Sequence, residues 1–75
     1  MEEKLLEILD KYDEQIRDYE VRAEALESKI TFCIEHNFFE EKRIARIEFD
    51  VISGLIHKWR NMYNEVNELL NLWMS

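Results

Sequence analysis

The chain has 75 residues, 47% of them hydrophobic and 36% charged, and its formal net charge at pH 7 is −7. A chain of this length forms one small domain at most and buries a modest share of its surface, so this much apolar side chain favours an oligomer. The negative charge argues against attraction to nucleic acid or anionic lipid and predicts that any charged partner is basic.

Residues that interrupt helices are almost absent, since the chain has no proline and a single glycine, Gly54. Sheet proteins use Gly and Pro in their turns, so this composition predicts a few long helices. The single cysteine, Cys33, excludes an internal disulfide and is typical of a reducing compartment, which predicts a cytoplasmic protein. We expect neither a signal peptide nor a membrane span, because the N-terminus is acidic and no apolar run approaches roughly 20 residues.

The first predicted helix covers about residues 2–35. Its apolar residues are spaced alternately four and three apart, which is an unbroken heptad repeat. This seam consists of Leu5, Leu9, Tyr12, Ile16, Tyr19, Ala23, Leu26, Ile30 and Cys33. Leu6, Ile8 and Ile34 widen it into a stripe, which suits a helical bundle better than an isolated two-stranded coiled coil.

The chain is expected to reverse at about residues 36–37. Asn37 is a preferred N-cap residue, and Glu40 three positions later completes a pattern that resembles a capping box. Phe38 and Phe39 would then lie at the tip and cover the end of the bundle.

The second predicted helix covers about residues 38–74. Its expected seam consists of Ile44, Ile47, Val51, Leu55, Trp59, Met62, Val66, Leu69 and Trp73. The repeat slips once around Ser53–Gly54, and glycine costs about 1 kcal/mol relative to alanine inside a helix. The sequence is therefore consistent with a kink or a short break at 53–54.

One alternative fold remains open. Residues 29–35 and 46–53 alternate in hydrophobicity and are rich in β-branched and aromatic residues, so they could pair as a β-hairpin between two helices. Against this, the link between them is long, charged and free of glycine. The preferred fold is all-α: a long antiparallel helical hairpin that pairs into an elongated homodimeric four-helix bundle.

No pattern of catalytic or metal-binding residues is present. Cys33 and His36 could face one way on a helix, but zinc needs three or four ligands and His57 is distant in sequence. No histidine is spaced from any of the three serines in a way that indicates a nucleophile and its base, and no glycine-rich phosphate loop occurs. We therefore expect a non-enzyme without a metal or another cofactor.

Trp59, Tyr63 and Trp73 could form a binding hot spot, because Trp and Tyr are enriched at such places. Their spacing also fits the seam or its flank, and core packing is the simpler interpretation. Asn61, Asn64, Asn67 and Asn71 form a neutral polar row on the same helix.

Acidic residues are concentrated in the first helix. Residues 1–35 hold eleven acids and five bases, whereas residues 36–75 hold six acids and five bases. The candidate partner-binding residues are Glu3, Glu7, Asp10, Asp13, Glu14, Asp18, Glu20, Glu24 and Glu27. Two copies side by side would carry about −14 over about 50 Å, roughly half the linear charge density of duplex DNA.

Two interpretations of this charge remain. It could be a solvated face that keeps a helical bundle soluble. It could instead imitate the nucleic acid backbone and occupy a basic groove or channel on a DNA-handling protein. A separate hypothesis is a dimeric scaffold or regulatory module that docks its partner on an apolar groove.

A very small, acidic, proline-free, apolar-rich helical chain resembles the early proteins of bacteriophages that disable host machinery. It is most similar to the inhibitors of the bacterial DNA polymerase sliding clamp found in staphylococcal phages. The resemblance concerns size, charge and general pattern over the whole chain. It implies an activity, namely plugging the DNA channel of the clamp ring as a dimer to stop DNA replication. Many clamp partners use a peptide that begins with glutamine, and the only such stretch here, "QIRDYE" from Gln15, fits that peptide poorly.

Overall fold

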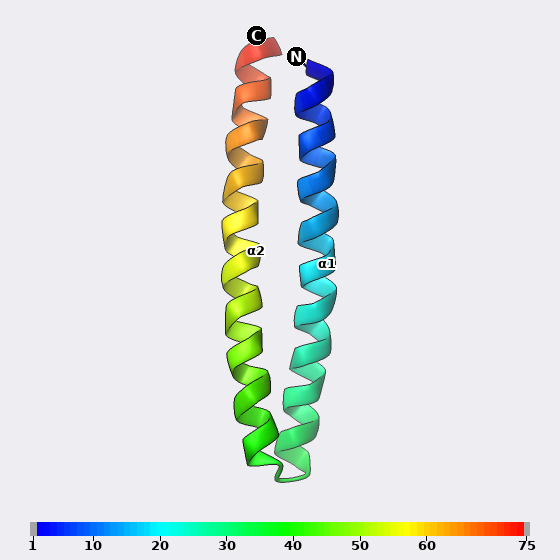
Figure 1. Ribbon diagram of the computed structural model, residues 1–75, viewed down its shortest axis with the longest axis vertical. Coiled ribbons are helices and arrows are strands. Elements are labelled where there is room, and N and C mark those ends of the chain that lie inside the picture. The colour runs from blue at the N-terminus through cyan, green and yellow to red at the C-terminus, as the bar shows by residue number, and fades with distance from the viewer. Residues whose placement is uncertain (1, 75) are drawn as a thin grey trace.

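The computed structural model describes residues 2–74, which form two helices, α1 (Glu2–Glu35) and α2 (Phe39–Met74). The helices run antiparallel and side by side in a hairpin that is 56 Å long and 14 by 13 Å across (Figure 1). The predicted all-α hairpin is confirmed. Residues 29–35 and 46–53 are helical, so the helix–β-hairpin–helix alternative is wrong. The apolar repeat of three and four residues outweighs the local β propensity of these two segments.

The seam of α1 is the one that the heptad repeat indicates. Leu9, Ile16 and Cys33 are buried, and the other six seam residues of α1 are half-buried. Ion pairs between residues four apart, Asp13–Arg17 and Asp18–Arg22, lie along the exposed side of the helix. Such pairs add a few tenths of a kcal/mol each, so burial of the seam dominates.

The seam of α2 differs from the expected one. Its seam residues, again three and four apart and each buried or half-buried, are Lys42, Ala45, Phe49, Ile52, Ile56, Trp59, Tyr63, Val66 and Leu70. Five of the expected residues, Ile44, Ile47, Val51, Leu69 and Trp73, are exposed. The reason is that α2 carries two neighbouring apolar rows, and the row containing Phe49, Ile56 and Leu70 is the one that packs on α1.

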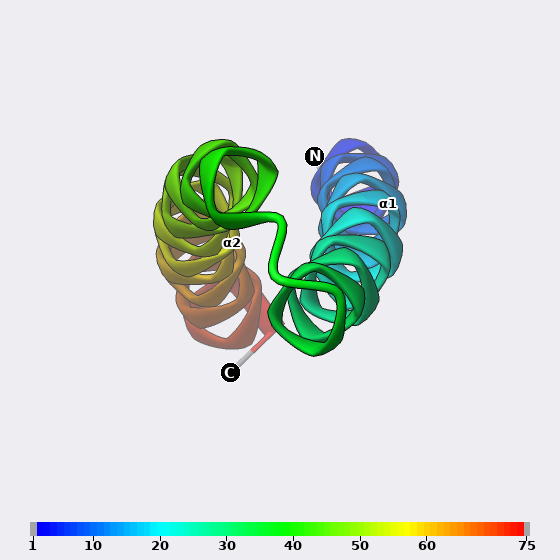
Figure 2. The ribbon, with the colours of Figure 1, turned by 90° about the horizontal axis from the view of Figure 1, so that it is seen from below.

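The corrected seam passes through Gly54 without a slip, and α2 continues there as a helix without the expected break. A heptad repeat held over this length winds two helices around each other in a left-handed supercoil. Figure 2, which looks along the hairpin from the turn, shows the two helices wound around one another.

Gly54→Ala is expected to raise the free energy of unfolding by about 0.5–1 kcal/mol, because glycine is a poor helix former. An added Cβ at position 54 would meet no atom within 4 Å, so no clash opposes this gain. Urea unfolding followed by circular dichroism measures the change. A loss of stability would mean that α2 is bent or broken at this position.

The turn is built as the end of α1 and not as an N-cap of α2. Asn37 has φ 60°, in the left-handed region. The Phe38 amide donates to the Cys33 carbonyl oxygen at 2.9 Å, and the Asn37 amide donates to the Ile34 carbonyl oxygen at 3.4 Å. This pair of bonds defines a Schellman motif with Asn37 as its left-handed residue. The capping-box interpretation is therefore wrong: Asn37 ends α1, and the Phe38 carbonyl oxygen accepts the first hydrogen bond of α2 from Lys42.

Substitutions at Asn37 distinguish these two roles. Serine replaces asparagine at an N-cap without loss, but at a left-handed position it should cost about 1 kcal/mol, because only Gly and Asn tolerate that conformation well. We expect Asn37→Ser to lower the thermal midpoint and Asn37→Gly to maintain or raise it. The opposite order in a thermal melt would restore the N-cap interpretation.

Aromatic side chains gather at the turn. The ring centroid of Phe32 lies 4.2 Å from that of His36 and 6.1 Å from that of Phe38. Phe39 does not take part in covering the end of the hairpin, since it is 67% exposed. Next to the turn, the small side chains of Cys33 and Ala45 are the two most buried in the described chain, which suits the close approach that a short connection imposes.

Candidate functional site

Each helix has one surface on either side of its seam. Because the helices are antiparallel, the residues that follow the seam on both helices share one side of the hairpin, and the residues that precede it share the other. Residues that directly follow seam residues form one side, which we call the polar flank; on α1 it carries Asp13, Glu20, Glu24 and Glu27. On α2 the same flank carries Arg46, His57 and Arg60. Shallow grooves along the polar flank are lined from both helices.

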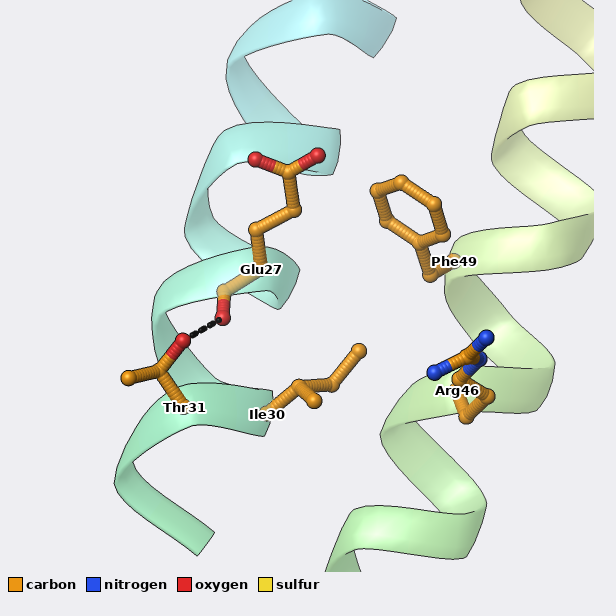
Figure 3. Close-up of a pocket in the computed structure, with 5 residues that line it drawn as sticks. All are labelled: Glu27, Ile30, Thr31, Arg46 and Phe49. Carbon is orange, nitrogen blue, oxygen red and sulfur yellow. Dashed lines mark hydrogen bonds between the residues drawn. The ribbon is translucent and has the colours of Figure 1, made fainter. Parts of the chain in front are cut away.

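One of these grooves, about 350 Å³ in volume, lies near the turn (Figure 3). Glu27, Ile30 and Thr31 line it from α1, and Arg46 and Phe49 line it from α2. The Thr31 hydroxyl donates to the Glu27 backbone carbonyl oxygen at 3.1 Å, so it is engaged within its own helix. The groove is open and holds no arrangement of a nucleophile with a base.

Ion pairing across the polar flank is limited. Arg60 reaches from α2 to Glu20 on α1, with an N–O distance of 2.5 Å, and both side chains remain substantially exposed. An exposed pair of this kind contributes about 0–1 kcal/mol. Its main consequence is that Glu20 already has a cation, so it is a weaker candidate for contact with a basic partner.

The acids of α1 are segregated around the helix. Most of them lie on the polar flank or on the outer surface, away from α2, and we call this set the acidic face. It consists of Glu3, Glu7, Asp10, Asp13, Glu14, Glu20, Glu24, Glu27 and Glu35, with Arg17 as its one base. Asp18, also predicted as a partner-binding residue, lies instead on the side that precedes the seam and pairs with Arg22.

The hairpin places nearly all uncompensated charge in one half of its length. Residues 2–20 hold eight acids and three bases, and the segment beside them, 60–74, holds two acids and one base, Arg60, which pairs with Glu20. Residues 21–59, which form the half with the turn, hold seven acids and six bases. A formal net charge of −6, out of −7 for the chain, is thus carried by the half that contains the ends of both helices, which we call the acidic half.

A neutral row on α2 explains why the acidic half is uncompensated. Asn64, Asn67 and Asn71 lie on the polar flank of α2, at the positions that arginines hold nearer the turn. Among the described residues, no ion pair involves Glu3, Glu7, Asp10 or Glu14, and all four are exposed. The asparagine row, which has no evident role in the sequence, therefore leaves these carboxylates without opposing charge.

The opposite side of the hairpin is the apolar flank, formed by residues that directly precede seam residues. On α2 it carries Ile44, Val51, Leu55, Met62 and Leu69, and on α1 it carries Ile8 and Phe32. Ile44, Val51, Leu69 and Phe32 are each about half exposed in the single chain. Five residues predicted as seam, Ile44, Val51, Leu55, Met62 and Leu69, belong to this flank. Of the other two exposed ones, Ile47 lies on the outside of α2 and Trp73 near its end.

The aromatic hot-spot candidates separate into different roles. Trp59 lies in the seam, where its ring meets Tyr12 edge-on at a centroid distance of 5.1 Å and Tyr19 at 6.3 Å. Tyr63 is also a half-buried seam residue, whereas Trp73 is 62% exposed. Trp59 and Tyr63 are thus structural, and Trp73 is the one accessible tryptophan.

Within residues 2–74, no group of three or more His, Cys, Asp or Glu side chains is arranged to hold a metal ion. Cys33 is buried and reduced, and His36 stacks with Phe38 at the turn. Neither α1 nor α2, over the part that the structure describes, has the length and apolar character of a membrane-spanning helix. Comparison with protein-family models, with curated proteins and with solved structures finds no match to this chain.

Proposed function

We propose that this protein is a non-enzymatic inhibitor that binds, through its acidic half, to the basic DNA-binding channel of a bacterial DNA-handling protein in place of DNA. The observation that carries the proposal is the concentration of −6 of the net charge of −7 in the half of the hairpin holding the helix ends. A charge held on a stiff rod is pre-positioned, so binding requires little reorganisation of the acidic side.

The spacing of the carboxylates supports this role. Glu3, Glu7, Asp10 and Glu14 follow one another every three or four residues, which is about 5–6 Å along a helix. All four side chains of this row are exposed. Because the attraction acts between exposed charges, it should steer association and weaken as salt is added.

The sliding clamp of the bacterial DNA polymerase is the partner that the resemblance suggests, because its ring surrounds DNA. The test immobilises the protein, measures binding of purified clamp at low and at high salt, and adds duplex DNA as competitor. We expect binding that falls steeply with salt and is displaced by DNA. The same column, loaded with bacterial lysate and eluted with DNA, identifies a different basic-channel partner if the clamp is not the target.

A second function is favoured by the exposed apolar residues of α2, namely a helical scaffold or regulatory module that docks its partner on an apolar surface. Binding of that kind tolerates salt, is not displaced by DNA, and should be lost on replacing an exposed apolar residue such as Trp73. Salt-resistant binding that DNA cannot displace would therefore overturn the inhibitor proposal in favour of the scaffold.

A further inference from the structure

The single hairpin leaves its apolar flank uncovered. Its only buried apolar residues in the described chain are Leu9, Ile16, Cys33, Ala45 and Leu70, all of them in the seam. Val51 and Leu69, on the apolar flank, are 58% and 57% exposed. Two helices can bury one seam but cannot close a core around a second apolar row, so this row needs another pair of helices.

We propose that the apolar flank binds a second copy of this chain, with both copies pointing the same way and α1 of each lying against α2 of the other. The twofold axis of this four-helix bundle runs along the hairpin, and every pair of neighbouring helices is antiparallel. This assembly does not depend on the proposed function, because it uses the flank opposite to the one that carries the acids.

The size of the flank suits a stable dimer. A surface 56 Å long and 14 Å wide presents about 800 Å² on each copy, which is the area per partner in a standard protein–protein interface. The flank spans the length of the hairpin, so apolar contacts can form at both ends and hold the two rods in line.

Apolar side chains match across this interface. Within the hairpin, Tyr19 lies level with Trp59, and Glu20 with Arg60. Rotation about the proposed axis does not change the position of a residue along the length of the hairpin. Each residue of α2 on the apolar flank therefore faces the residue of the second copy's α1 that lies at the same position along this length. Ile44 then meets Phe32 of the second copy near the turn, and Leu69 meets Ile8 of the second copy at the other end.

Charged side chains on the same flank determine the relative direction of the two copies. On α1 the flank carries Lys4, Lys11, Arg22 and Lys29 with a single acid, Asp18, whereas on α2 it carries Glu41, Glu48 and Glu65 with a single base, Lys58. In the proposed dimer, Lys29 comes level with Glu48 of the second copy, and Lys11 with Glu65. No ion pair within the described part of the chain uses a lysine, so these cations are available.

Copies running in opposite directions would lose this complementarity. The flank of α1 would then face α1 of the second copy, placing lysines and arginine against one another, and Glu48 would come level with Glu65 of the second copy. Like charges at this distance repel. The charges of the flank therefore favour the arrangement in which both turns lie at the same end.

The proposed dimer also concentrates the acidic halves. With both copies pointing one way, a net charge of about −12 lies within about 28 Å, half the hairpin length, or about one charge per 2.3 Å. Duplex DNA carries about one per 1.7 Å. The two acidic faces point outward on opposite sides of the bundle, as the two phosphate strands of a duplex do.

The first test measures molecular mass in solution by sedimentation equilibrium for the parent chain, Val51→Glu and the matched control Ile47→Glu. Val51 and Ile47 are both 58% exposed, but Ile47 lies on the outside of α2, away from the flank. We expect twice the chain mass of 9.2 kDa for the parent and the control, and the single mass for Val51→Glu. A monomeric parent, or equal dissociation by both variants, overturns the proposal.

The second test exchanges the charges of the flank at low salt. Lys11→Glu combined with Lys29→Glu should weaken the dimer at least about tenfold, because acids then face acids on both sides of the axis. Adding Glu48→Lys and Glu65→Lys to the same chain should restore it. A double variant that dimerises as well as the parent, or a quadruple variant that stays dissociated while its helical content is intact, contradicts the pairing of α1 with α2.

The third test fixes the direction. Spin labels are attached at Glu35→Cys, in the last turn of α1, in a Cys33→Ala background, and the distance between the two labels of the dimer is measured. Copies pointing the same way bring the labels within about 30 Å, whereas opposite directions separate them by about 50 Å in a hairpin that is 56 Å long. The longer distance overturns the proposed direction. Because none of these measurements includes a partner protein, their failure would leave the proposed function to be judged by its own test.

Discussion

Replacing Glu3, Glu7 and Glu14 by glutamine and Asp10 by asparagine is expected to abolish tight binding to the basic-channel partner and leave the helical hairpin intact. Exposed charge pairs contribute up to about 1 kcal/mol each. At about 0.5–1 kcal/mol per pair, four lost pairs weaken binding roughly 30- to 900-fold. The four side chains are exposed and unpaired within the described chain, so their neutralisation removes no internal contact. Titration calorimetry at low salt measures the loss, and circular dichroism verifies the helix content.

A control variant removes the same amount of charge elsewhere. Glu35, Glu40, Asp50 and Glu68 are all exposed and lie off the row formed by Glu3, Glu7, Asp10 and Glu14. The first three lie in the half with the turn, and Glu68 lies on the outside of α2. Changing these four to the matching amides leaves the acidic row of α1 in place. We expect this control to retain most of the binding. Equal losses in both variants would show that overall charge, and not the placement of the acidic row, governs the interaction.

Trp59→Ala is expected to have the largest effect on stability. Its ring fills the middle of the seam and makes edge contacts with both Tyr12 and Tyr19. Removing a large aromatic side chain from a core costs about 3–5 kcal/mol, and half-burial places this residue near the lower end. A domain this small has only about 3–5 kcal/mol of stability from its core, so most of the chain should lose its helical structure at 37 °C.

Trp73→Ala is the matched control for this change. The side chain is 62% exposed near the end of α2, so its removal should change the free energy of unfolding by less than about 0.5 kcal/mol. Thermal melts followed by circular dichroism, at one protein concentration, compare the two variants. If Trp59→Ala has the same thermal midpoint as the parent, the two tyrosines do not pack on this ring and the described seam is wrong.

The sequence predicts α1 and its seam fully and the seam of α2 only in part, for a physical reason. On α1 only one apolar row runs the whole length of the helix, and most positions beside it are charged, so its heptad repeat has one solution. On α2, Ile44, Val51 and Leu69 stand directly before Ala45, Ile52 and Leu70, and either row satisfies the repeat. Periodicity cannot distinguish two neighbouring rows, because the choice depends on which one the other helix covers.

The turn and the charge distribution depend on contacts between distant segments. Asn37 suits both an N-cap and a left-handed helix end, and only the hydrogen bonds from Phe38 and Asn37 back to α1 decide between them. Counting charges by helix assigns the excess of acids over bases to residues 1–35, and this count is correct. Once the hairpin sets residues 60–74 beside residues 2–20, the excess of acids is found in one half of the hairpin, and the half with the turn is nearly neutral.

The first residues of α1 and the last residues of α2 lie together at one end of the hairpin (Figure 1). Tension applied between them would therefore peel the helices apart one turn at a time, loading each contact singly in place of shearing them all together. Rupture would start among the mutually repelling carboxylates and travel toward the tight packing of Cys33 and Ala45, which would be the last to part. Under such tension, the contacts next to the turn would resist separation the longest.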